Sequence, residues 1–151
     1  MRKRFLHAAL LSLFVAAAMY GQSNDAMDRL LGEDQATIGD ASYIILGAAG
    51  LVGDDATTDQ VMAVVADKNL LPQDRTADKA ITLGEVSYLI MKTQDLRGGL
   101  LYLAFPGPRY AARQLAYLGL ISGNTHPSRV VSGQEVVRIL DAALYKKGAN
   151  Q

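Results

Sequence analysis

The chain of 151 residues contains no cysteine, no tryptophan and only two histidines. Without cysteine it has no disulfide framework, no thiol nucleophile and no lipoprotein anchor. His7 lies near the N-terminus, so His126 has no second His or Cys with which to bind a metal or activate a nucleophile. A glycine-rich phosphate loop is also missing. The sequence therefore predicts neither an enzyme nor a metal or cofactor site.

The chain also has no excess of positive or negative charge. The chain has 15 basic and 15 acidic residues. Residues 1–22 hold three of the basic residues and no acidic one, so the remainder carries a net charge of −3. A mildly acidic chain without a basic patch of interleaved aromatic residues gives no reason to expect nucleic acid as a partner.

The N-terminus has the layout of a secretory signal peptide. Residues 2–4 are basic, residues 5–19 form an apolar run, and small residues follow. We expect residues 1–22 to be the leader, with cleavage between Ala16 and Ser23. The alternative is a retained membrane anchor, but the apolar run is shorter than the ~20 residues that span a bilayer. The expected mature protein is exported, periplasmic or at the cell surface, and has no transmembrane span.

One ten-residue phrase occurs three times. It reads TIGDASYIIL at residues 37–46, TLGEVSYLIM at 82–91 and, in a more divergent form, VSGQEVVRIL at 131–140. Every difference between the first two copies conserves physical character. An internal repeat of this length indicates a repeated supersecondary unit. We predict one domain over residues 25–146, built from helix–loop–helix units at about 25–51, 57–96 and 107–146.

Each copy begins with the pattern of a helix N-terminus. In S/T-x-x-D/E, the hydroxyl accepts a backbone N–H of the first turn and the acid returns to the cap residue's own N–H. Three matches at equivalent positions make this signal strong. The predicted caps are Thr37 with Asp40, Thr82 with Glu85, and Ser132 with Glu135.

Apolar residues follow each cap at helical spacing, one stripe per helix. Further helices are expected at residues 59–69 and 109–118, where Asn69 and Gly119 stand just past the end, as residues that accept a left-handed backbone. The predicted fold class is all-α. The predicted stripes are Ala41, Ile44, Ile45 and Ala48; Val86, Leu89, Ile90 and Thr93; Val136, Ile139, Leu140 and Ala143; Val61, Val65 and Ala66; Ala111, Leu115 and Leu118.

Residues 116–144, AYLGLISGNTHPSRVVSGQEVVRILDAAL, resemble the S-layer homology (SLH) domain family. The Gly-Leu-Ile-x-Gly phrase at 119–123, the loop with Pro127 and Arg129, and the Ser132–Glu135 cap carry the resemblance. It implies three units around a pseudo-threefold axis and a non-catalytic module that binds cell-wall polymer in grooves between units. The ligand-binding residues that this implies are Arg109, Tyr110, Gly123, Asn124 and Arg129.

Two positions differ from that family and support an alternative. The family's capped helix carries arginine directly after the cap, where this chain has Ile38, Leu83 and Gly133, and its first helix opens with a tryptophan that this chain lacks. The alternative is a periplasmic structural or protein-interaction subunit that keeps the SLH-like fold without binding polysaccharide.

The segment between the second and third units is unusually apolar. Gly98 and Gly99 precede it, and Pro106 and Pro108 follow it. It is either a connector buried against the bundle or an exposed patch for another envelope protein, for a membrane surface or for a homo- or hetero-oligomer. The patch residues are Leu100, Leu101, Tyr102, Leu103 and Phe105.

Overall fold

The computed structural model describes residues 25–149, and the predicted signal peptide lies outside them. Within this range the chain is helical and forms no extended strand, which confirms the all-α prediction. Residues 25–32 form a first helix. The helices that follow are α2 (Ile38–Ala48), α3 (Thr58–Asp67), α4 (Leu83–Thr93), α5 (Leu100–Ala104), α6 (Pro108–Tyr117) and α7 (Gly133–Gly148).

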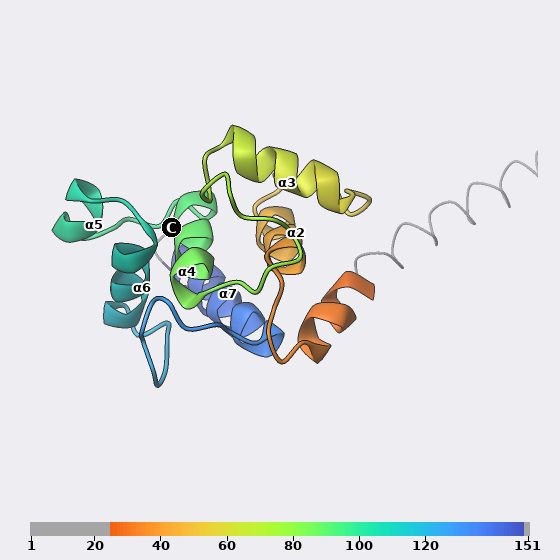
Figure 1. The fold of residues 1–151 in the computed structure, drawn as a ribbon. Helices are drawn as coiled ribbons and strands as arrows, with labels where there is room; N and C mark the ends of the chain where they lie inside the picture. Colours follow the sequence, from red (N-terminus) through yellow and green to blue (C-terminus); the bar gives the residue numbers. More distant parts are fainter. Residues whose placement is uncertain (1–24, 150–151) are drawn as a thin grey trace, which may run out of the picture.

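The three helices that begin with the repeated phrase form the centre of the molecule. Helices α2, α4 and α7 contact one another, α3 packs on α2, and α6 packs on α4 (Figure 1). Residues 25–32 lie at the start of α7, where the Gly133 N–H donates to the Glu33 carbonyl over 3.0 Å. Each central helix is therefore next to one outer helix: α2 next to α3, α4 next to α6, and α7 next to residues 25–32.

A closed cycle of backbone hydrogen bonds joins the three repeats. The Ala36 N–H donates to the Val131 carbonyl, and the Ile81 N–H to the Ala36 carbonyl, both over 2.8 Å; the Val131 N–H donates to the Ile81 carbonyl over 3.3 Å. Each residue stands directly before a helix cap and is buried. The cycle supports the predicted pseudo-threefold arrangement, which itself stays a prediction.

The predicted cap hydroxyls occupy the expected positions. Thr37, Thr82 and Ser132 are the N-caps of α2, α4 and α7, and each accepts the backbone N–H three residues later. The reciprocal half of the box forms only at Thr82, whose N–H donates to Glu85 over 2.8 Å. A further reciprocal box, Thr57 with Gln60, opens α3 and was not predicted.

At the other two caps the predicted acid has a different partner. The Thr37 N–H donates to Glu33 over 2.9 Å, while Asp40, shorter by one methylene group, accepts from the Thr37 hydroxyl. Glu135 instead accepts from Arg129. The hydroxyl half of a capping box is local, whereas the acid half is open to competition from neighbouring segments.

Most of the predicted stripe residues are buried. The prediction is wrong for Ala48 and Ala66, which are exposed, and only partly right for Thr93 and Leu118, which are half-buried. All four lie in the last turn of their helix or at its C-cap, past the packed part. Asn69 and Gly119 have φ values of 48° and 75°, which confirms their predicted role in ending α3 and α6.

Candidate functional site

A groove runs between the start of α4, the start of α6 and the loop before α7. We call it the α4–α6 groove; its volume is about 950 Å³. It lies between the predicted second and third units, where the family resemblance places a ligand. The lining residues are Pro72, Thr82, Glu85, Pro108, Arg109, Arg113, Asn124, Thr125, His126, Pro127 and Ser128.

Gly84 holds the three walls of the groove close together. Its N–H donates to the Pro127 carbonyl, and the N–H of Leu83 donates to the Arg129 carbonyl, both over 2.8 Å. A β-carbon at Gly84 would lie 3.0 Å from the Pro127 oxygen and 3.1 Å from the Pro108 β-carbon. Glycine therefore allows the close approach of both neighbouring segments, and a larger residue would push them apart slightly.

The loop wall is ordered by its own short-range hydrogen bonds. The Asn124 side-chain oxygen accepts the His126 N–H over 2.9 Å, and His126 Nδ1 accepts the Ser128 N–H over 3.3 Å. Gly123 precedes the turn with a φ of 78°, in the left-handed region that favours glycine. The turn presents amide, hydroxyl and imidazole groups along one side of the groove.

The groove carries unneutralised positive charge. Arg109 and Arg113 are exposed, and neither forms an ion pair within the described residues. The carboxylate in the lining, Glu85, is only 7% exposed and lies 2.7 Å from Arg75 Nε. It also accepts the Thr82 N–H and hydroxyl over 2.8 Å. Glu85 is thus neutralised, while the two arginines face solvent without an acidic partner.

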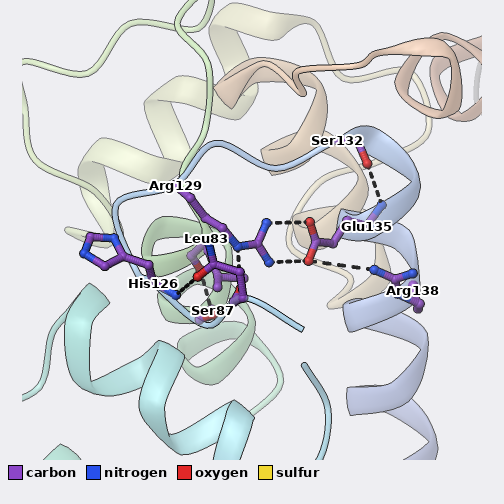
Figure 2. Close-up of polar contacts among 8 residues, drawn as sticks. Leu83, Ser87, His126, Arg129, Ser132, Glu135 and Arg138 are labelled. Carbon is purple, nitrogen blue, oxygen red and sulfur yellow. Dashed lines mark hydrogen bonds and ion pairs between the residues drawn. The ribbon is translucent and has the colours of Figure 1, made fainter. Parts of the chain in front are cut away.

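Arg129 has a structural role in this arrangement (Figure 2). Its guanidinium forms a bidentate pair with Glu135, with one bond of 2.7 Å, and its Nε donates to the Asn124 carbonyl. The hydrogen bond from Arg129 lowers the pKa of Glu135, against the opposing effect of burial. The same bond raises the pKa of Arg129. This pair fastens the loop to the first turn of α7.

The ligand-binding residues that the resemblance implied therefore separate into distinct places. Arg109 and Asn124 line the groove, Gly123 shapes its turn, and Arg129 is paired with Glu135. Tyr110 stacks on Phe105 with ring centroids 5.9 Å apart. The groove also contains Arg113, Thr125, His126 and Ser128, which were not predicted as site residues.

A second groove lies between the first helix, α2 and the start of α3. This α2–α3 groove has a volume of about 240 Å³. Gly39 corresponds to Gly84, and a β-carbon there would lie 3.2 Å from the β-carbon of Ala77. The lining includes Asp25, Asp40 and Asp54, with Arg29 as the single basic residue.

The apolar connector is exposed rather than buried. Leu100, Leu101, Leu103 and Phe105 are 87%, 54%, 68% and 62% exposed, whereas Tyr102 is 9% exposed. Tyr102 points inward and meets Tyr88 edge to face at 6.5 Å. Burial, with a smaller contribution from Tyr88, raises the pKa of Tyr102 to about 12.

The connector is nevertheless fixed in place. The Gly99 N–H donates to the Gln114 side chain of α6 over 2.9 Å. A β-carbon at Gly98 would overlap the Tyr102 ring. Together with the stacking of Phe105 on Tyr110, these contacts hold the leucines of α5 outward.

Among residues 25–149, no cluster of three or more His, Cys, Asp or Glu side chains is suited to a metal ion. The helices of this range include none that is both long and apolar enough to cross a membrane. No protein-family model, no curated protein and no solved structure matches this chain.

Proposed function

We propose that this chain is an exported, non-catalytic envelope module with an SLH-like fold that binds an anionic cell-wall polymer in the α4–α6 groove. The observation that carries the proposal is the pair Arg109 and Arg113, which line the groove without an acidic partner among the described residues. Guanidinium groups bind carboxylate and phosphate in bidentate geometry. A cleft lined by one sign of charge also concentrates oppositely charged ligands.

The other groups along the groove suit a saccharide backbone. Asn124, Thr125 and Ser128 offer amide and hydroxyl groups that both donate and accept hydrogen bonds. The groove is long and open to solvent rather than a closed pocket, which fits a segment of polymer better than a small metabolite. We infer that the arginines bind the acidic substituents and that the loop binds the sugar hydroxyls.

Sedimentation of the purified chain with cell-wall sacculi tests the proposal. The wild type is expected to sediment with sacculi and to stay in solution once their anionic polymers have been stripped with acid. Arg109→Gln combined with Arg113→Gln should weaken binding about tenfold or more, because a hydrogen bond to a charged group contributes about 1.5–3 kcal/mol. Lys146→Gln with Lys147→Gln, at the end of α7, removes the same charge elsewhere and should have little effect.

A second candidate is a structural or protein-interaction subunit that keeps the bundle without binding polymer. It is supported by the position after each cap, where Ile38 and Leu83 are fully buried and Gly133 has no side chain. A wild-type chain that fails to sediment with intact sacculi would refute polymer binding. Cross-linking to another envelope protein in the same extract would then favour the second candidate.

A further inference from the structure

We propose that the connector docks onto an anionic lipid bilayer, with its apolar side chains inserted between the lipid headgroups. We call Leu100, Leu101, Leu103 and Phe105 the α5 surface. Among the described helices, α5 lies against α6, and its inward-pointing Tyr102 also meets Tyr88 of α4. Helices α5 and α6 lie at one side of the molecule, away from residues 25–32 (Figure 1). The α5 surface is therefore free of cover from the rest of the bundle.

The charge around the α5 surface matches an anionic bilayer. Residues 96–134 contain no acidic residue and four arginines, of which Arg129 is paired with Glu135. Arg97 precedes α5, and Arg113 lines a hollow of about 380 Å³ beside it together with Leu100 and Leu101. The acids that adjoin the segment are Asp95 before it and Glu135 after it. Exposed leucine and phenylalanine flanked by arginine are typical of segments that lie in a membrane interface.

The shape of the α5 surface favours lipid over a protein partner. Successive helix residues are about 100° apart, so Leu100, Leu101 and Leu103 spread around the side opposite Tyr102 and form a convex ridge. If each side chain presents about 150–200 Å² when complete, the exposed fractions amount to about 400–550 Å². A stable protein interface buries about 800 Å² on each partner. Lipid headgroups accommodate a small convex ridge without a complementary surface.

The contacts of the connector keep the α5 surface in the conformation that docking requires. Tyr102 fills the inward side, Gln114 holds the Gly99 N–H, and Phe105 stacks on Tyr110. Exposed apolar side chains that are held in one conformation lose less entropy on insertion than those of a mobile loop. The apolar side chains that insert into lipid are distinct from the groups proposed to bind polymer, while Arg113 borders both the hollow beside α5 and the α4–α6 groove.

A single tryptophan placed in the α5 surface tests the proposal. The chain has no tryptophan, so Phe105→Trp provides a unique fluorophore. With vesicles of equal parts phosphatidylglycerol and phosphatidylcholine, we expect a blue shift of its emission and quenching by brominated acyl chains. Vesicles of phosphatidylcholine alone should bind at least about fivefold more weakly, since each arginine near an anionic surface contributes about that factor.

Variants in the Phe105→Trp background separate docking from folding. Leu100→Ser with Leu103→Ser should reduce vesicle binding about tenfold with no change in the thermal unfolding midpoint, because both side chains are exposed. Tyr145→Ser, which removes an apolar side chain that is 83% exposed on α7, should bind vesicles like the parent. Binding of the α5 variant to sacculi is expected to be unchanged, so a failure of lipid docking is distinguishable from a failure of polymer binding.

Three results would overturn the proposal. The first is equal binding to anionic and neutral vesicles, and the second is equal binding by the Leu100→Ser, Leu103→Ser variant and its parent. The third is a blue shift that needs no lipid and grows with protein concentration, which would assign the α5 surface to contact between copies of the chain.

Discussion

The α2–α3 groove and the α4–α6 groove are built on the same backbone contacts but differ in charge and size. In both, the N–H groups of the first two residues after a helix cap donate to carbonyls of the next loop, all over 2.8 Å. In both, a glycine lies against the first residue of the neighbouring outer helix, Thr58 or Pro108. Yet the first groove is small and lined by Asp25, Asp40 and Asp54, whereas the second is about 950 Å³ and carries Arg109 and Arg113.

This difference shows that the repeat determines how the units pack together but not the charge of the groove between them. The repeated residues, the caps and the glycines, fix how one unit meets the next. Asp40 and Glu85 are equivalent residues of the repeat, but the other charged residues that line the grooves, Asp25, Arg29, Asp54, Arg109 and Arg113, lie outside the repeated phrase. One scaffold can therefore present an acidic groove and a basic groove in the same molecule, and only the basic groove suits an anionic polymer.

The largest expected loss of stability comes from a substitution at the third junction, between residues 25–32 and α7. A β-carbon at Gly133 would overlap the carbonyl of Leu30, which is backbone and cannot rotate away. Gly133→Ala should lower the free energy of unfolding by about 3 kcal/mol or more. Gly47→Ala is the matched control, because Gly47 lies in α2 with nothing within 4 Å of its β-carbon position. Urea unfolding gives the free energy of unfolding of both variants. Equal stability of the two would contradict the packing described for this junction.

Removing the ion pair between Arg129 and Glu135, at the third cap, should cause the next largest loss of stability. Glu135→Gln is expected to cost about 2 kcal/mol at pH 7, since it leaves the half-buried Arg129 without its bidentate partner. Because the folded-state pKa of Glu135 is lowered, its contribution is complete above the ordinary value of 4.5 and is lost as pH falls below it. The stability difference between wild type and variant should therefore shrink in acid. The equivalent change at the exposed pair, Arg29→Gln, should cost less than about 1 kcal/mol.

The two grooves can be compared directly by adding a methyl group to each. Gly84→Ala is expected to cost about 1–2 kcal/mol, because the Pro127 oxygen lies 3.0 Å from the added carbon. Gly39→Ala should cost less, because its closest contact is 3.2 Å and includes the side chain of Ala77. Chemical denaturation compares the loss of unfolding free energy in the two variants. A larger loss for Gly39→Ala would show that the packing around Gly39 is tighter than that around Gly84.

The local parts of this fold could be predicted from the sequence, and the grooves could not. The caps at Thr37, Thr82 and Ser132 and the helix ends at Asn69 and Gly119 depend on a few neighbouring residues. The groove depends on the meeting of α4, α6 and a loop some 40 residues later in the chain. Nothing local to Arg113 or His126 indicates that they line one groove with Glu85. The resemblance to SLH domains pointed to the junction where the α4–α6 groove lies, and Arg109 and Asn124 line that groove. It also assigned Arg129 to the ligand, but the charge of Arg129 is used within the fold.

The exposure of the connector was likewise left open by its sequence. An apolar run between glycines and prolines suits both a buried strap and a protruding turn. Its position became clear only from Tyr102, which fills the inward side and leaves Leu100 and Leu103 on the outside. Burial depends on whether another element covers α5, and among the described helices only α6 lies along it, while α4 meets the inward-pointing Tyr102.

The most direct test of the central claim is a titration of the ¹⁵N-labelled chain with a soluble anionic polysaccharide fragment released from sacculi, followed by amide chemical shifts. Polymer binding in the α4–α6 groove predicts shifts at Gly84, at Arg113 and over residues 124–128. No shifts are expected at Asp40, Asp54 or Thr58 in the α2–α3 groove. Shifts confined to the α2–α3 groove, or none at saturating fragment, would contradict the assignment of ligand binding to the basic groove.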